Sequence, residues 1–216
     1  MKTLKKGILI AIEGIDGSGK STLAQNLSTK LKKSDIGCIL TREPGATPLG
    51  TIIRNLLHEK PVSMCPKAEY LLFAADRAQH MAEIIEPALQ EHKIVLSDRM
   101  GDSSVVYQGY ARGLDIPMIQ QINKWAMNNT TPDLIFYVQL SVDEAINRII
   151  KRNEALTSFE KEGRDFLQKL VNGFNTLYAD RKDVITLDGN NTPAQLTEQA
   201  FDTIVTRVKT HCSKQR

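Results

Sequence analysis

The chain has 216 residues, of which 41% are hydrophobic and 25% charged, a length and composition that favour one globular domain. Its formal net charge of +3 suits an anionic small molecule but is too small and too scattered to predict a nucleic-acid-binding surface. No apolar run approaches the roughly 20 residues of a membrane span, and three separated cysteines without a CxxC pair argue against a zinc site or disulfide framework, so we expect a cytoplasmic protein.

Short apolar runs alternate with amphipathic segments along the whole chain. The runs that predict strands are 8–12, 38–41, 94–97, 134–138 and 184–187. The segments that predict helices are 20–33, 47–58, 66–91, 115–128, 142–152, 160–180 and 193–211. Strands that are apolar throughout and separated by helices are typical of a parallel sheet covered on both faces. The sequence therefore predicts an α/β fold in one domain, 1–216, without a dividing linker.

A glycine-rich loop follows the first predicted strand and precedes the first predicted helix. Its sequence fits G-x-x-x-x-G-K-[ST], and its residues are Gly14, Ile15, Asp16, Gly17, Ser18, Gly19, Lys20, Ser21 and Thr22. Glycines let backbone N–H groups turn inward around an anion, and the helix N-terminus adds its positive dipole end. The lysine supplies a charge to the β- and γ-phosphates, and the Ser21 hydroxyl is placed to bind Mg²⁺. This context predicts a nucleoside triphosphate site rather than a chance glycine turn.

A GTPase reading of this loop is disfavoured. Asp98 to Gly101 satisfies DxxG at the end of the third strand. The pair Asn123-Lys124, however, lacks the aspartate that would read guanine, and it lies in mid-helix, where we expect surface polar residues. The chain is also too short for the added domains of most motor ATPases.

Three arginines stand where a second polyanion would bind. Arg42 and Arg99 follow the second and third strands, and ligands of open α/β sheets bind beyond these strand ends. Arg77 follows Phe73 by four residues, which puts a guanidinium and an aromatic ring on one helix face. Each arginine alone would suit a surface ion pair, but together they indicate a phosphate- and base-binding site. Asp98 is either a Walker-B-like magnesium ligand, directly or through water, or a helix or loop cap.

The order and spacing of several segments resemble the thymidylate kinase family. These segments are EGIDGSGKST, TREPG, LLFAADRAQH, SDRMGDSSVVYQG and TPDLIFYV, and the match is strongest over about the first 140 residues. The resemblance implies a P-loop kinase fold with a five-stranded parallel sheet and a lid over about 150–163. It also implies the reaction ATP + dTMP → ADP + dTDP, with Mg²⁺ as cofactor, in a homodimer. The Glu43-Pro44 bond is expected to be cis, as in the family.

The resemblance also implies which residues bind dTMP, namely Asp16, Arg42, Phe73, Arg77, Arg99, Ser103, Tyr107 and Gln108. Phe73 would stack on thymine, Arg77 would bond its carbonyl edge, and Arg99 would hold the phosphate. Tyr107 would sit where a ribose 2′-hydroxyl would clash. Asp16 would accept a hydrogen bond from the sugar 3′-hydroxyl, unless it only stabilises its own loop as an Asx turn.

The chain departs from the family pattern at three places. Met100 replaces an aromatic residue or histidine, and Gln139 replaces the aspartate that usually ends the fourth strand. The third departure is in the polar stretch 153–163, which is either a mobile segment or an ordinary surface loop. Its sequence TSFE, at 157–160, lacks the arginine expected in a lid.

The missing lid arginine leaves the transfer-stabilising cation open. We expect Arg152 to act with Lys20 and Arg99 as the catalytic set, the alternative being a solvated residue at a helix end. Glu160 and Glu162 either act through magnesium or are exposed. Two other functions remain: a kinase for another nucleoside monophosphate or for a broader range of pyrimidines, and a nucleotide-binding protein without catalysis.

Overall fold

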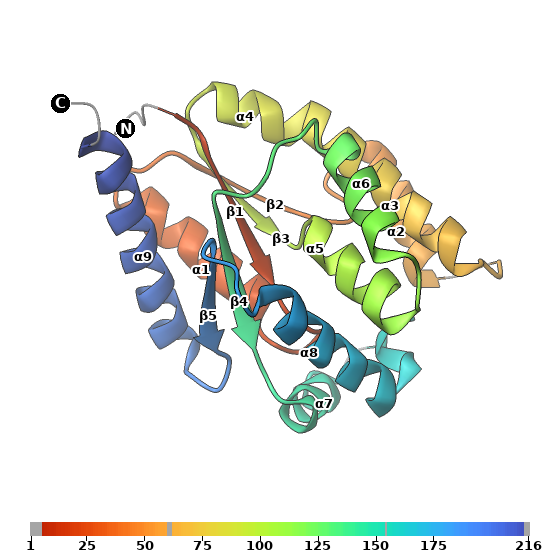
Figure 1. Cartoon of the computed structure of the whole chain (residues 1–216). Helices are drawn as coiled ribbons and strands as arrows, with labels where there is room; N and C mark the ends of the chain where they lie inside the picture. Colours follow the sequence, from red (N-terminus) through yellow and green to blue (C-terminus); the bar gives the residue numbers. More distant parts are fainter. Residues whose placement is uncertain (1–5, 60–61, 154, 214–216) are drawn as a thin grey trace.

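The structure is a computed structural model that describes residues 6–59, 62–153 and 155–213, with side chains of the last helix described as far as Val208. Its sheet has five strands in the order β2-β3-β1-β4-β5, and every neighbouring pair is parallel (Figure 1). The strands are β1 (Ile8–Glu13), β2 (Cys38–Arg42), β3 (Ile94–Asp98), β4 (Leu134–Gln139) and β5 (Val184–Asp188). All five predicted strands are confirmed, and each runs one residue further at its carboxyl end.

The predicted helices are also present. They are α1 (Lys20–Lys33), α2 (Pro48–Glu59), α3 (Pro66–His80), α4 (Glu86–Gln90), α6 (Ile116–Ala126), α7 (Val142–Lys151), α8 (Arg164–Tyr178) and α9 (Pro193–Ser213). A π-helical turn, η1 (Met81–Ile85), joins α3 to α4, so the predicted segment 66–91 is one continuous helical rod.

Two helical predictions need correction. The segment 160–180 is interrupted: a 3₁₀ turn, η3 (Glu160–Glu162), ends at Gly163, whose φ of 87° breaks the helix before α8. The sequence pattern also did not predict the helix that the structure has at α5 (Gly101–Ser104) and at its π-helical continuation η2 (Val105–Ala111). Nearly all of that helix is buried, polar residues included, so it carries no amphipathic period.

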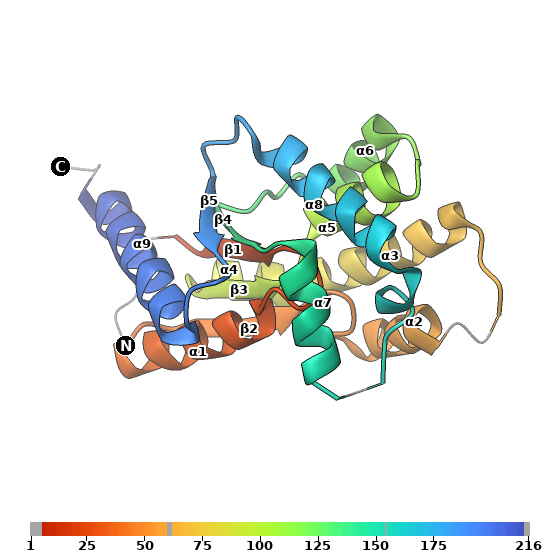
Figure 2. The ribbon, with the colours of Figure 1, turned by 90° about the horizontal axis from the view of Figure 1, so that it is seen from below.

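Successive side chains of each strand point to opposite faces of the sheet, so the hydrophobic core is divided between these two faces. On β1, Ile8, Ile10 and Ile12 pack with α1 and α9, whereas Leu9 and Ala11 pack with the helices of the other face. Figures 1 and 2 show α1 and α9 on one side of the sheet and α3, α4, α5, α6 and α8 on the other. Helices therefore cover both faces, as predicted. Continuous burial holds for β1, β3 and β4 but not for the edge strands β2 and β5, which are partly exposed.

The central strand β1 lies at the point where the chain changes direction across the sheet, between β3 and β4. Ligands of open α/β sheets bind beyond the carboxyl ends of the strands at such a point. The loops that follow β1, β2 and β3 meet there, and the site described below lies among them. None of the helices in the described part of the chain has the length and hydropathy that crossing a bilayer requires.

Candidate active site

The glycine-rich loop connects β1 to α1 and requires glycine at tight points. Gly14 has φ 147°, and a Cβ there would lie 2.6 Å from the Val138 carbonyl oxygen. Gly17 has φ 79°, and a Cβ there would lie 2.7 Å from the Ala145 carbonyl oxygen. The backbone can therefore follow this path only without side chains at these two positions. Helix α1 begins directly after this loop, at Lys20, and Gly19 is the N-cap of the helix.

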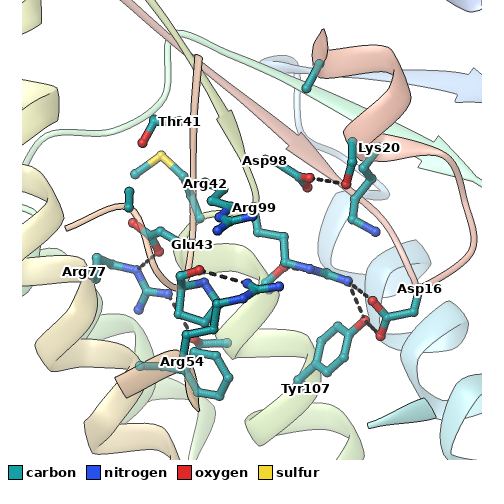
Figure 3. A pocket seen from close by; sticks show the side chains of 18 of the residues that line it. Asp16, Lys20, Thr41, Arg42, Glu43, Arg54, Arg77, Asp98, Arg99 and Tyr107 are labelled. Atoms are coloured by element: carbon teal, nitrogen blue, oxygen red, sulfur yellow. Dashed lines mark hydrogen bonds and ion pairs between the residues drawn. The ribbon is translucent and has the colours of Figure 1, made fainter. Parts of the chain in front are cut away.

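Lys20 and Ser21 stand at the first turn of α1, as the motif predicts. The Lys20 ammonium donates to the Ile15 carbonyl oxygen at 2.8 Å, and burial together with nearby Arg99 lowers the pKa of Lys20 to about 8. The Ser21 hydroxyl donates to the Asp98 carboxylate at 2.5 Å, on the side of the cleft where Figure 3 labels Asp98 and Lys20. A hydroxyl and a carboxylate side by side supply the hard oxygen ligands that Mg²⁺ prefers, so these two residues fit a magnesium site.

Arg99 connects the phosphate loop to the helix that follows β3. Its guanidinium donates to the Gly14 carbonyl at 2.9 Å, to Asp16 at 2.5 Å, and to the hydroxyls of Ser103 and Tyr107 at 3.1 Å each. Tyr107 in turn donates to the second Asp16 oxygen at 3.0 Å. Burial alone would raise the pKa of Asp16, but the positive charge of Arg99 keeps this pKa below its ordinary value. Arg99 has φ 73°, a conformation that is costly for arginine and typical of functional sites.

The predicted base-reading residue Arg77 is almost completely buried, at 1% exposure. It donates to Glu43 at 2.9 Å, to Asn123 at 2.7 Å and to Ser104 at 3.0 Å. Asn123 is itself buried, so the expectation that it is a surface polar residue is wrong. Its carbonyl oxygen accepts from both Arg77 and the Tyr70 hydroxyl, which explains why a polar side chain faces inward from α6. The Glu43-Pro44 bond that precedes α2 is cis, as predicted.

Aromatic side chains form another wall of the cleft. The ring of Phe73 lies 6.0 Å from that of Phe159, which lies 5.6 Å from the Tyr107 ring in an edge-on arrangement. Gln108 is buried and donates to Glu69 at 3.0 Å. These side chains converge from α3, η2 and the segment before η3.

Arg152 and Glu160 contact each other at a third part of the cleft lining. Both oxygens of Glu160 accept hydrogen bonds from Nη2 of Arg152 at 3.1 Å. The Glu160 side chain is only 2% exposed, so the alternative that it is an exposed residue is wrong. Glu162, which is exposed, pairs instead with Arg112.

One cleft with a volume of about 630 Å³, within the range of small-molecule sites, is lined by most of the side chains described above. The cleft brings together the following residues named from the sequence: Asp16, Lys20, Ser21, Arg42, Phe73, Arg77, Asp98, Arg99, Ser103, Tyr107, Gln108 and Arg152. Arg42 is exposed, and its side chain has no hydrogen bond or ion pair among the described residues. A cleft with several cations beside an aromatic wall can hold two phosphate-bearing ligands.

Comparison with known proteins agrees with this geometry. The sequence model of the family described as thymidylate kinase matches residues 12–200. The chain belongs to the thymidylate kinase family. It is 41% identical to the thymidylate kinase of Halothermothrix orenii over 198 residues, which cover 91% of this chain and 95% of that protein. It is 47% identical to that of Syntrophotalea carbinolica over 156 residues, which cover 72% of each chain.

Two charged or ionisable side chains that line the cleft were not predicted from the sequence. Arg54 and His58 lie one turn apart on α2, and both line the cleft. Arg54 donates to the Pro44 carbonyl at 2.9 Å, and a Cβ on Gly45 would lie 2.7 Å from its Cδ, so Arg54 packs directly under the TREPG loop. The i, i+4 spacing of a cation and a histidine after TREPG is the signal that could have identified them.

Proposed function

We propose that this protein transfers the γ-phosphoryl group of ATP to the phosphate of dTMP and so produces ADP and dTDP. The observation that carries the proposal is that a single cleft holds the Lys20–Ser21 end of the phosphate loop and the Arg99–Phe73 pocket. Family membership supports the same reaction, since the relatives compared above are named thymidylate kinases. A cytoplasmic location, where ATP and dTMP are available, is part of the proposal.

The donor would bind at the phosphate loop. Backbone N–H groups of residues 14–19 and the N-terminus of α1 would hold its phosphates, and Lys20 would reach the β- and γ-phosphates. Ser21 and Asp98 would hold Mg²⁺, which when bound would neutralise phosphate charge between donor and acceptor.

The acceptor would bind in the aromatic half of the cleft. Phe73 would stack on thymine, while Arg77 and Gln108 would read its edge and Ser103 would line the same pocket. Arg99 and exposed Arg42 would hold the acceptor phosphate. Asp16 would accept from the 3′-hydroxyl, and Tyr107, fixed by its hydrogen bonds to Asp16 and Arg99, would exclude a 2′-hydroxyl.

The chemical step needs position and charge neutralisation rather than a general base, because the acceptor phosphate oxygen is already ionised at neutral pH. Lys20, Arg99 and Arg152 would surround the transferring group. We assign the role of lid, over about 150–163, to the segment that carries Arg152 and Glu160; of these residues, Glu154 lies outside the described part of the chain.

The decisive experiment measures ADP release with dTMP, dUMP, UMP, CMP, AMP and GMP as acceptors. Turnover that prefers dTMP supports the proposal. Preference for another acceptor indicates a different monophosphate kinase, and nucleotide binding without turnover indicates a non-catalytic protein. Lys20→Ala should lower kcat by at least about a hundredfold while the fold is retained, because a preorganised cation is lost.

Phe73→Ala tests the acceptor pocket separately. Loss of base stacking should raise the KM for dTMP by about tenfold and leave the KM for ATP nearly unchanged. Gln79→Ala, on the same helix but outside the cleft, is the matched control. Equal effects of Phe73→Ala on both substrates would contradict the stacking role.

We further propose that the protein is a homodimer. Helices α2, α3 and α6 lie side by side (Figures 1 and 2) and expose large apolar side chains: Leu49, Ile52, Leu71, Met118 and Trp125. Trp125 is 78% exposed, which is unusual for this residue type in a monomer. A second copy of the chain would cover this surface.

A further inference from the structure

The segment before η3 is fastened to the acceptor side of the cleft. The Ser158 hydroxyl donates to the Leu57 carbonyl oxygen on α2 at 2.9 Å. The next residue, Phe159, is 7% exposed and packs against the rings of Tyr107 and Phe73. Ser158 stands where the family pattern has an arginine, so this chain uses the position for anchoring rather than for charge.

The same segment forms a capping box. The Thr157 hydroxyl accepts from the Glu160 backbone N–H at 3.2 Å, and the Glu160 carboxylate accepts from the Thr157 backbone N–H at 2.8 Å. This reciprocal pattern is the one that T-x-x-E favours at the start of a helical turn. It fixes the Glu160 side chain locally, while Phe159 fixes the turn against the cleft wall.

Glu160 also contacts Arg152. Its two oxygens share Nη2 of Arg152, each at 3.1 Å, and its side chain is nearly inaccessible to water, whereas Arg152 is 35% exposed. A buried carboxylate is costly unless it is paired, and a charge-assisted contact to a carboxylate reduces the number of rotamers that a guanidinium can adopt. A fixed carboxylate therefore orients the guanidinium of a partly exposed arginine.

We propose that Glu160 is a positioning residue that places the Arg152 guanidinium at the transferring phosphoryl group. This inference rests on the proposed role of Arg152 as the transfer cation. Glu160 follows directly after a residue that touches the acceptor pocket, so the position of the cation is set relative to the acceptor rather than by its own helix end. Misplacement of a catalytic group by about 1 Å can lower a rate by about a hundredfold.

Steady-state kinetics of Glu160→Gln provide the first test. We expect kcat to fall by about tenfold to a hundredfold, with the KM values for ATP and dTMP changed by less than about threefold. Glu162→Gln is the matched control, since Glu162 lies in the same turn and pairs with Arg112, outside the cleft. A wild-type or raised kcat in Glu160→Gln would overturn the inference, the latter because it would mean that Glu160 merely masks the cation.

A double-mutant cycle with Arg152→Ala separates this inference from the function on which it rests. Glu160→Gln should cause no further loss of kcat in the Arg152→Ala background, because a positioning residue has no effect without the group it positions. Additive losses would contradict positioning. An Arg152→Ala enzyme with wild-type kcat would instead refute the role of Arg152 itself.

Glu160→Asp gives the same test with the charge retained. The shorter side chain draws the carboxylate back by about one methylene, so kcat should fall while the thermal unfolding temperature stays near that of the wild type. A wild-type kcat in Glu160→Asp would also count against positioning.

Discussion

Glu13 is an ionisable side chain without any exposure to solvent, directly before the phosphate loop. It accepts hydrogen bonds from the Met100 backbone N–H at 2.8 Å and from the Ser103 hydroxyl at 2.6 Å. Burial, with a further contribution from Asp102, raises its pKa to about 7. Glu13 therefore links the P-loop to the turn that carries Arg99.

This pKa predicts a pH-dependent stability. The folded protein keeps the Glu13 proton up to about pH 7, whereas the unfolded chain loses it near the ordinary value of 4.5. The Glu13 contribution to the free energy of unfolding should thus be full below pH 4.5, fall by about 3 kcal/mol between pH 4.5 and 7, and stay constant above. Urea unfolding of wild type and Glu13→Gln measures it, because the variant lacks this titration. A difference between the two proteins that does not change with pH would refute the assignment.

At the scale of elements, α6 joins α3 to the start of α5. From its buried face, Asn123 accepts from Arg77 and Tyr70 of α3 and donates to the Gly101 carbonyl at the start of α5. The neighbouring Lys124 is exposed. A single side chain of α6 therefore aligns Arg77 with the helix that follows Arg99.

Asn123→Leu should destabilise the protein by about 3 kcal/mol, because the Gly101 carbonyl and one arm of Arg77 lose their partner in a buried place. The KM for dTMP should also rise, with the KM for ATP unchanged. Lys124→Leu is the control and should change the free energy of unfolding by less than about 0.5 kcal/mol. If both variants unfold at the same urea concentration, the role of Asn123 as a link between helices is wrong.

Helices and strands with a clear hydrophobic pattern could be predicted from the sequence, and those without such a pattern could not. The strands are short apolar runs, and α1, α2 and α7 are amphipathic, so their positions follow from local pattern. Helix α5 with η2 buries serines and a glutamine beside valines, and its helical character depends on partners that lie far away in the sequence. The P-loop was predictable for the same local reason, whereas the burial of Glu160 and Asn123 depends on Arg152 and Arg77, which only the fold brings near.

At the scale of the whole molecule, the apolar side chains of α2, α3 and α6 predict the oligomeric state. Light scattering should give a mass of twice 24.1 kDa for the wild type. Trp125→Glu should shift the mass toward the monomer, because a charge at a buried contact is costly. Ile150→Glu, at a similarly exposed apolar residue on α7, should leave the dimer intact. A monomeric wild type would refute the proposed dimer.

The contact between Arg99 and Asp16 has a consequence for what the molecule rejects. Arg99 pairs with the anionic Asp16, and under the proposed binding mode the dTMP phosphate would replace this partner and release the aspartate for the sugar. Thymidine, the uncharged nucleoside, offers no anion for this exchange. If the proposed roles of the two residues hold, the Arg99–Asp16 pair would select against unphosphorylated nucleosides even when their base and sugar fit the pocket.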